Sequence, residues 1–238
     1  MKPQTRTTLL VVLFAAVPAI VLGLILWLAA GPVAGVAVLA VVGVALAAWA
    51  RLGGDRRVLA AIGGREADPE ADARLLNLAE GLSISAGLRQ PQLRVIDSPS
   101  LNAMAAGTRA DRAIVGVTSG LLTELDRMEL EAVLAEEFIQ IRHHQTTPAT
   151  VLVATFGFGR AIALDADRDA DADQAAVALT RYPPALASAL EKLEAKGTEV
   201  AGQSASLAHL WLAEPRTGVA PGRGRLPLRE RIEALREL

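Results

Sequence analysis

The chain has 238 residues, a formal net charge of −2 and no cysteine. The near-neutral charge argues against a nucleic-acid partner, and the lack of thiols excludes disulfide bonds and thiolate metal sites. Hydrophobic residues make up 52% of the chain but aromatic residues only 3%, so the apolar residues are mainly alanine, leucine and valine. That bias predicts membrane-spanning segments.

Two uncharged runs at the start of the chain are candidates for such segments. Residues 7–30 and 33–50 carry no charge. At about 1.5 Å per residue the first is long enough to cross a bilayer, and the second is near the short end of the spanning range. Only Gly31-Pro32 separates them, which predicts a helical hairpin in the lipid bilayer. The alternative, a cleaved signal peptide with an apolar linker, is disfavoured because the first run is too long and the second follows at once.

The charges beside the hairpin predict its orientation. Basic residues flank only the outer ends, with Lys2 and Arg6 before the first span and Arg51, Arg56 and Arg57 after the second. The positive-inside rule then places the N-terminus and everything after residue 51 on the cytoplasmic side of the cell (inner) membrane. The expected regions are a transmembrane hairpin at 1–52, a juxtamembrane linker at 53–68 and a soluble domain at 69–238.

The soluble domain is predicted to be α+β and mainly helical, with a small sheet. Short runs that alternate or are rich in β-branched residues, bounded by Ser, Pro and Gly, predict strands at 92–97, 101–107 and 113–117. Helical spacing of apolar residues predicts helices at 69–86, 118–124, 126–144, 148–164, 165–179, 185–196 and 228–238, with a Gly-rich linker at 218–224. The run 148–164 is apolar but short and contains Arg160, so we expect a core helix there rather than a third span.

The helix that begins after Asp126 carries the most informative residues. Asp126-Arg-Met-Glu129 is a capping pattern, with an acidic acceptor at the N-cap and Glu three residues later. A buried stripe is expected at Leu130, Leu134, Phe138 and Ile141, and a polar face at Glu129, Glu136, Gln140 and His143.

The sequence Glu136-Glu137-Phe138-Ile139-Gln140 stands where a zinc-protease helix would carry H-E-x-x-H. In that motif two histidines one turn apart bind zinc, and the glutamate polarises the metal-bound water. Here the glutamate, Glu137, is present. Both imidazole positions hold other residues, Glu136 and Gln140.

From about residue 70 onward, the chain resembles the HtpX-like membrane zinc metallopeptidases, which are gluzincins. Several segments agree in order: Asn102–Gly107 with N-A-F-A-x-G, Val117–Leu122 and Met128–Ala135 with the run before H-E-x-x-H, Arg168–Ala176 with R-E-x-E-A-D-x-x-A, and the segments Tyr182–Lys192 and Pro227–Ile232. The resemblance implies a zincin-like domain behind the hairpin. It also implies a substrate-side edge strand that contains Asn102, Ala103, Met104, Ala105 and Gly107.

The resemblance assigns the third zinc-ligand position to Asp171. All three ligand positions (Glu136, Gln140 and Asp171) therefore differ from the family, and only the catalytic Glu137 is kept. An amide oxygen is a poor zinc ligand. Without zinc nothing lowers the pKa of a water molecule enough for Glu137 to activate it. We expect no firmly bound cofactor, and zinc if the family's activity is retained.

Two functions stay open on these grounds. The first is a pseudopeptidase that binds a peptide or membrane-protein partner without cutting it, for example by strand addition at residues 102–107. The second is an active metal-dependent endopeptidase of membrane or misfolded proteins with an oxygen-rich site. Deliberate replacement of the ligands is a third explanation of the residues at positions 136, 140 and 171.

Other polar residues have ordinary interpretations. An ion shared by Glu136, Gln140 and His143 is disfavoured, because residues two turns apart lie roughly 10 Å apart along a helix. The acidic run 165–173 lacks the glycine and spacing of a calcium loop and is expected to be a solvated helix face. His209 lies in an apolar run and is expected to be structural.

Overall fold

The computed structural model describes residues 3–52, 54–156, 168–203, 205–215 and 225–238. Its helices are α1 (Pro3–Ala30), α2 (Pro32–Leu52), α3 (Gly54–Ile62), α4 (Ala73–Ala86), α5 (Ser119–Glu124), α6 (Arg127–Arg142), α7 (Thr146–Phe156), α8 (Arg168–Thr180), α9 (Pro183–Lys196) and α10 (Leu228–Arg236), with short 3-10 helices η1 (Ala110–Arg112) and η2 (Ala205–Leu210). Its strands are β1 (Arg65–Glu66), β2 (Gln92–Ile96), β3 (Ala103–Ala106) and β4 (Ile114–Thr118). The fold class predicted from the sequence, mainly helical with a small sheet, is confirmed.

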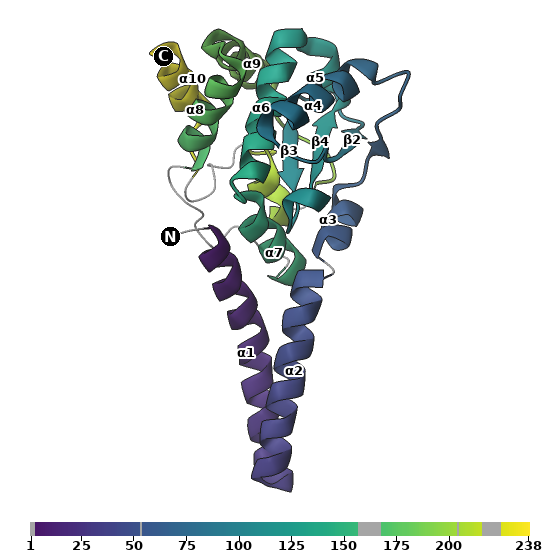
Figure 1. Cartoon of the computed structure of the whole chain (residues 1–238), viewed down its shortest axis with the longest axis vertical. Coiled ribbons are helices and arrows are strands. Elements are labelled where there is room, and N and C mark those ends of the chain that lie inside the picture. The colour runs from purple at the N-terminus through teal and green to yellow at the C-terminus, as the bar shows by residue number, and fades with distance from the viewer. Residues whose placement is uncertain (1–2, 53, 157–167, 204, 216–224) are drawn as a thin grey trace.

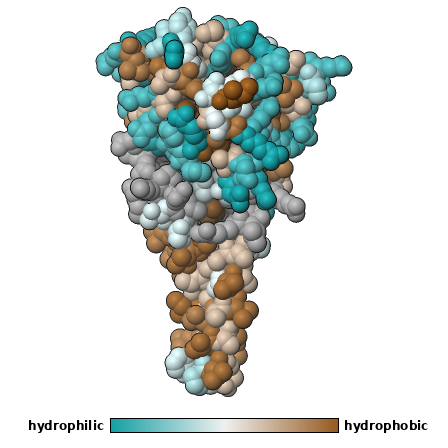
Figure 2. Space-filling view, viewed as in Figure 1, coloured by the Kyte–Doolittle hydropathy of each residue, from teal (hydrophilic) through white to brown (hydrophobic). Residues whose placement is uncertain are grey.

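The hairpin forms a stalk below a globular head (Figure 1). Thr8–Ala30 and Pro32–Trp49 are long and apolar enough to cross a membrane, and the surface of the stalk is predominantly apolar where the head is mixed (Figure 2). Two glycines let the helices approach closely. A Cβ atom on Gly35 would lie 2.7 Å from the carbonyl oxygen of Gly23 and from the Cβ atom of Trp27.

The head rests on the stalk through α7. Figure 1 shows this helix beside the upper ends of α1 and α2, and Val151 of α7 clusters with Leu10 and Val11 of α1. Ala149, Thr150 and Val151 are buried inside the protein. Over the described residues this segment is thus a short packed helix, as predicted. The rest of the run predicted as 148–164 lies outside the described residues.

The residues predicted as a juxtamembrane linker carry ordered structure. They form α3 and then β1, which pairs antiparallel with β2. Val58 and Ile62, one turn apart on α3, are both buried in a cluster with Met104 and Trp211. This pair buries the apolar side of α3 against the head, so the stalk joins the head through a packed helix and not through a free tether.

The sheet has the order β1-β2-β4-β3. β2 and β4 are parallel, whereas β3 pairs antiparallel with β4 and occupies one edge. Alternate residues of β3 face opposite sides: Ala103 and Ala105 join the main core, and Met104 joins the smaller cluster around α3.

The helix α6 forms the centre of the main core. Asp126 accepts from the Glu129 N–H at 2.9 Å and the Glu129 carboxylate accepts from the Asp126 N–H at 2.8 Å, so the predicted capping box is present. The predicted apolar stripe is buried, but so are Glu136, Glu137 and Gln140. Helices α4, α8 and α9 surround α6, which explains why its polar side is not solvated.

Candidate functional site

The candidate site begins on the polar side of α6. Glu136 and Gln140 lie one turn apart, and the Gln140 Nε2 donates to the Glu136 Oε1 at 3.3 Å. Glu136 and Glu137 are 0% exposed and Gln140 is 1% exposed. Of the four residues predicted to form the catalytic and metal site, the structure thus brings together the three that lie on α6 and buries them completely.

The fourth predicted residue, Asp171, is not in the site. It is exposed, whereas Asp169 and Asp173 on the same helix are 0% and 4% exposed. Residues two apart on a helix point about 200° apart, and residues four apart share a face. Asp169 and Asp173 therefore face α6 together while Asp171 points away. The prediction of a solvated face for 165–173 is likewise wrong for these two acids.

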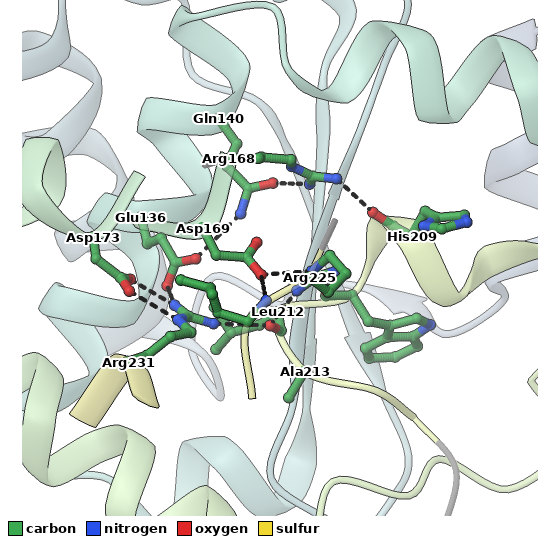
Figure 3. Close-up of polar contacts among 12 residues, drawn as sticks. Glu136, Gln140, Arg168, Asp169, Asp173, His209, Leu212, Ala213, Arg225 and Arg231 are labelled. Carbon is green, nitrogen blue, oxygen red and sulfur yellow. Dashed lines mark hydrogen bonds and ion pairs between the residues drawn. The ribbon is translucent and has the colours of Figure 1, made fainter. Parts of the chain in front are cut away.

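Arg231 of α10 joins the acids of two helices. Its guanidinium donates to both carboxylate oxygens of Asp173, at 2.8 and 2.6 Å, and to the Glu136 Oε2 at 2.7 Å. Arg231 is 1% exposed, and Figure 3 shows its guanidinium between the two carboxylates. A guanidinium group thus lies between Glu136 of α6 and Asp173 of α8.

Two further arginines complete the cluster. Arg168 donates to the Gln140 Oε1, and Arg225 donates from Nε to the Asp169 Oδ2 at 2.8 Å (Figure 3). The same Asp169 oxygen accepts from the Leu226 N–H at 3.0 Å. We call Glu136, Glu137, Gln140, Arg168, Asp169, Asp173, Arg225 and Arg231 the arginine cluster.

The electrostatics of the cluster depend on Glu137. Burial raises the pKa of Glu137 to about 8, against the pull of three guanidinium groups, and neither carboxyl oxygen has a hydrogen-bond partner among the described residues. Glu137 is therefore protonated at neutral pH. Burial likewise raises the pKa of Glu136 well above its usual value, against the pull of Arg231. The carboxyl groups of Glu136, Asp169 and Asp173 face the three guanidinium groups.

The other pKa shifts in the cluster also result from burial and from neighbouring charges. Burial alone would raise the pKa of Asp169, but the guanidinium groups, Arg225 first, outweigh it and hold the pKa at about 2. Burial lowers the pKa of Arg168 to about 10, which leaves it charged at neutral pH. Burial also disfavours the charged form of Arg231, yet Asp173 and Glu136 raise its pKa above the usual value.

These residues do not fit a zinc ion. The Glu136 carboxylate and the Gln140 amide oxygen are bonded to guanidinium groups, and three nearby positive charges oppose a dication. Among the described residues, no group of three His, Cys, Asp or Glu side chains is arranged to hold a metal. His143 is exposed at the end of α6, so it does not supply the missing imidazole.

The predicted substrate strand is present but covered. Residues 103–106 form the edge strand β3, and Asn102 through Gly107 are all buried. The Leu212 N–H donates to the Ala103 carbonyl at 2.7 Å, on the side of β3 away from β4. In this structure the edge is not open to a peptide from another chain.

Sequence patterns did not reveal the basic half of the site. Arg168 and Arg231 stand within segments that carry the family resemblance, and Arg225 stands two residues before the second of these segments. The signal that was available is the spacing of Asp169 and Asp173, four residues apart in a helix. Their partners lie 56 and 58 residues away in the chain, which no local pattern reveals.

Comparison with known proteins identifies the scaffold. Residues 69–182 match Peptidase family M48. A Protease HtpX homolog of Tropheryma whipplei (strain TW08/27) is 32% identical over 195 residues, which cover 64% of this chain and 67% of that protein. A Protease HtpX homolog of Dictyoglomus thermophilum is 31% identical over 229 residues, which cover 76% of this chain and 75% of that protein. With its apolar hairpin and this match, the chain belongs to peptidase family M48 as a membrane-anchored, HtpX-like member.

Proposed function

We propose that this protein is a pseudopeptidase, an M48 scaffold that binds peptide or membrane-protein segments without hydrolysing them. The observation that carries the proposal is the position of Arg231. Its guanidinium is bonded to Glu136 and Asp173 inside the protein, so a side chain supplies the positive charge between α6 and α8.

The state of Glu137 supports the same proposal. A general base must be ionised and within reach of the proton that it removes. Glu137 is fully buried and its pKa is raised to about 8. Its carboxyl oxygens have no hydrogen-bond partner among the described residues. This burial without a partner supports the proposal that Glu137 has no catalytic role here.

The proposed location follows from the basic residues beside the hairpin. We place the head in the cytoplasm, because the basic residues that flank the spans lie on the side of the head and the Gly31-Pro32 turn has none. The partners reached from there are the bilayer and cytoplasmic or membrane-embedded protein segments.

Metal content and proteolysis test the proposal together. Detergent-purified protein is analysed for zinc, manganese, iron and cobalt by mass spectrometry, beside the E136H/Q140H variant, which restores the two imidazoles. A H143A/H144A variant is the matched control, since it removes the two histidines near the end of α6. We expect no stoichiometric metal in the unmodified protein or in the control.

Cleavage of an unfolded protein substrate and of a membrane-protein substrate is measured for the unmodified chain and for Glu137→Gln. We expect the same background for both. One transition metal per chain, or cleavage that is lost in Glu137→Gln, contradicts the proposal.

A further inference from the structure

The segment Trp211–Ala213, which directly follows η2, lies along the outer edge of β3. The Leu212 N–H donates to the Ala103 carbonyl at 2.7 Å, and Met104 and Trp211 are antiparallel bridge partners. Strand addition to a sheet edge is a general way to bind an extended peptide. Here the chain itself supplies the strand.

The side chain of Asn102 fixes the same segment in register. Its Nδ2 donates to the Ala213 carbonyl at 3.1 Å and its Oδ1 accepts from the Ala213 N–H at 3.2 Å. The same Nδ2 donates to the Thr198 carbonyl at 2.9 Å. An amide side chain at the start of β3 thus binds the backbone N–H and C=O of Ala213, the residue after Leu212, and these contacts do not depend on the side chain of that residue.

The arginine cluster holds the other side of the segment. Arg225 donates to the Trp211 carbonyl at 2.8 Å and to the Leu212 carbonyl at 2.6 Å, and Arg231 donates to the Leu212 carbonyl at 3.1 Å. Arg168 donates to the carbonyl of His209, near the end of η2, at 2.9 Å. The segment therefore lies between the sheet edge and the cations of the cluster. Figure 3 shows the His209 and Leu212 carbonyls directed at these guanidinium groups.

We propose that residues 211–213 are a built-in strand ligand, which fills the peptide site between β3 and the arginine cluster. This inference rests on the proposed function, because it describes the site at which the pseudopeptidase would hold a peptide. A peptide from a partner pairs with β3 only after the built-in strand has left. The guanidinium groups then bind its carbonyls and do not activate water.

The packing of the built-in strand defines the class of peptide. Trp211 is buried in the cluster with Val58 and Ile62, and Leu212 is buried in the main core on the opposite side of the sheet. A replacement must offer an extended backbone with two consecutive large apolar side chains. Charged or glycine-rich peptides would leave these two buried places empty.

The test weakens the pairing of the built-in strand with β3 and adds the same strand as a separate peptide. A fluorescein-labelled peptide of residues 207–215, LAHLWLAEP, is titrated against full-length protein in detergent by fluorescence anisotropy. Leu212→Pro removes the N–H that pairs with Ala103, and Leu212→Ala is the matched control, which loses more of the side chain but keeps the N–H. We expect no saturable binding to the unmodified protein and at least about tenfold tighter binding to Leu212→Pro than to Leu212→Ala, because affinity scales with the fraction of open molecules.

A second variant keeps the test decisive if Leu212→Pro fails to fold. Asn102→Ala removes the amide contacts and leaves the backbone of β3 unchanged. We expect faster hydrogen exchange over residues 207–215 than in the unmodified protein, together with measurable binding of the labelled peptide. Unchanged exchange, or faster exchange without binding, overturns the inference, as does a folded Leu212→Pro that binds no better than Leu212→Ala.

The outcomes separate this inference from the proposed function. Mass spectrometry of the peptide after incubation with the opened variants shows whether it is cut. Binding followed by cleavage supports the built-in strand but contradicts the pseudopeptidase proposal. If the peptide is neither bound nor cut, the result contradicts the built-in strand but not the pseudopeptidase proposal.

Discussion

At the scale of the residue, Glu137 shows how burial changes the chemistry of a catalytic group. Its two carboxyl oxygens have no hydrogen-bond partner among the described residues, and an ionised carboxylate in such a place is strongly disfavoured. The same residue type beside a metal-bound water would be a base. Here it is a buried carboxyl group, and its protonation state affects the stability of the fold.

The raised pKa of Glu137 predicts a pH dependence of folding. The folded-state pKa is about 8 and the unfolded reference is 4.5, so the folded state binds the extra proton between these values. Stability at this residue is greatest below the unfolded pKa and decreases as pH rises through the folded pKa, by up to about 1.4 kcal/mol per pH unit.

The Glu137→Gln variant tests this dependence. It should lack the decrease, and its stability relative to the unmodified protein should therefore grow between about pH 5 and pH 8. The measurement is the free energy of unfolding of both proteins in denaturant across that range. A difference that does not change with pH would show that Glu137 is ionised in the folded state.

At the scale of the element, the orientation of α8 determines which of its alternating acidic residues face α6. Asp169 and Asp173 are bonded to Arg225 and Arg231 respectively, while Asp171 is exposed. Removal of a buried carboxylate leaves a buried guanidinium group without one of its partners. This costs far more folding free energy than the removal of a solvated charge. The three acids look alike in the sequence but differ in energetic role.

Substitution of these acids one at a time tests the assignment. Asp173→Ala should destabilise the head by about 3 kcal/mol because it removes both contacts to the Arg231 guanidinium. Asp171→Ala, on the opposite side of the helix, should change stability by less than about 0.5 kcal/mol. Chemical denaturation followed by far-UV circular dichroism measures both. Equal effects would mean that α8 is rotated relative to this structure.

The hairpin offers a matched pair of glycines for a second test of packing. A Cβ atom on Gly35 would meet the Gly23 carbonyl oxygen at 2.7 Å, whereas one on Gly43 would meet the Ala19 Cβ at 3.7 Å, an ordinary contact. Gly35→Ala should therefore force α1 and α2 apart, at a cost of roughly 1–3 kcal/mol. Gly43→Ala should be nearly neutral. Thermal unfolding in detergent compares the two variants, and an equally small loss for both would exclude close packing at Gly35.

At the scale of the whole molecule, the head and the stalk are joined over a wide contact. The helix α7 packs on α1 and on α3, and its Thr150 hydroxyl accepts from the Gly107 N–H at the end of β3 at 2.9 Å. The edge strand that holds the built-in ligand is thus linked through one helix to the membrane anchor. The orientation of the hairpin therefore decides in which compartment that edge lies.

Single cysteines test the orientation, since the chain has none of its own. Ile84→Cys places a thiol on an exposed position of α4 in the head, and Ala30→Cys places one beside the turn of the hairpin. With the head in the cytoplasm, a membrane-impermeant maleimide should label Ala30→Cys in intact cells and Ile84→Cys only after permeabilisation. The reverse pattern would overturn the cytoplasmic assignment.

Local physical rules in the sequence determined most of the elements. Uncharged length predicted the two apolar helices, alternation predicted β2 and β4, and the Asp126–Glu129 pattern predicted the start of α6 and its capping box. Each of these features depends on neighbours within a few residues, such as the spacing of apolar side chains or an acceptor beside free N–H groups. The spacing of Glu136 and Gln140, one turn apart on α6, could be predicted for the same reason.

Only the tertiary structure decided which side chains contact Glu136 and Gln140. Arg231 meets Glu136 across 95 residues and Asp173 across 58, and the segment around Leu212 meets β3 across more than 100 residues. The choice of Asp169 and Asp173 over Asp171 depends on how α8 is rotated against α6. These contacts are set by the docking of helices whose charges must be paired once water is excluded. The sequence by itself therefore determined that Glu136 and Gln140 lie one turn apart on a capped helix, and the packing of distant helices decided which arginines pair with them.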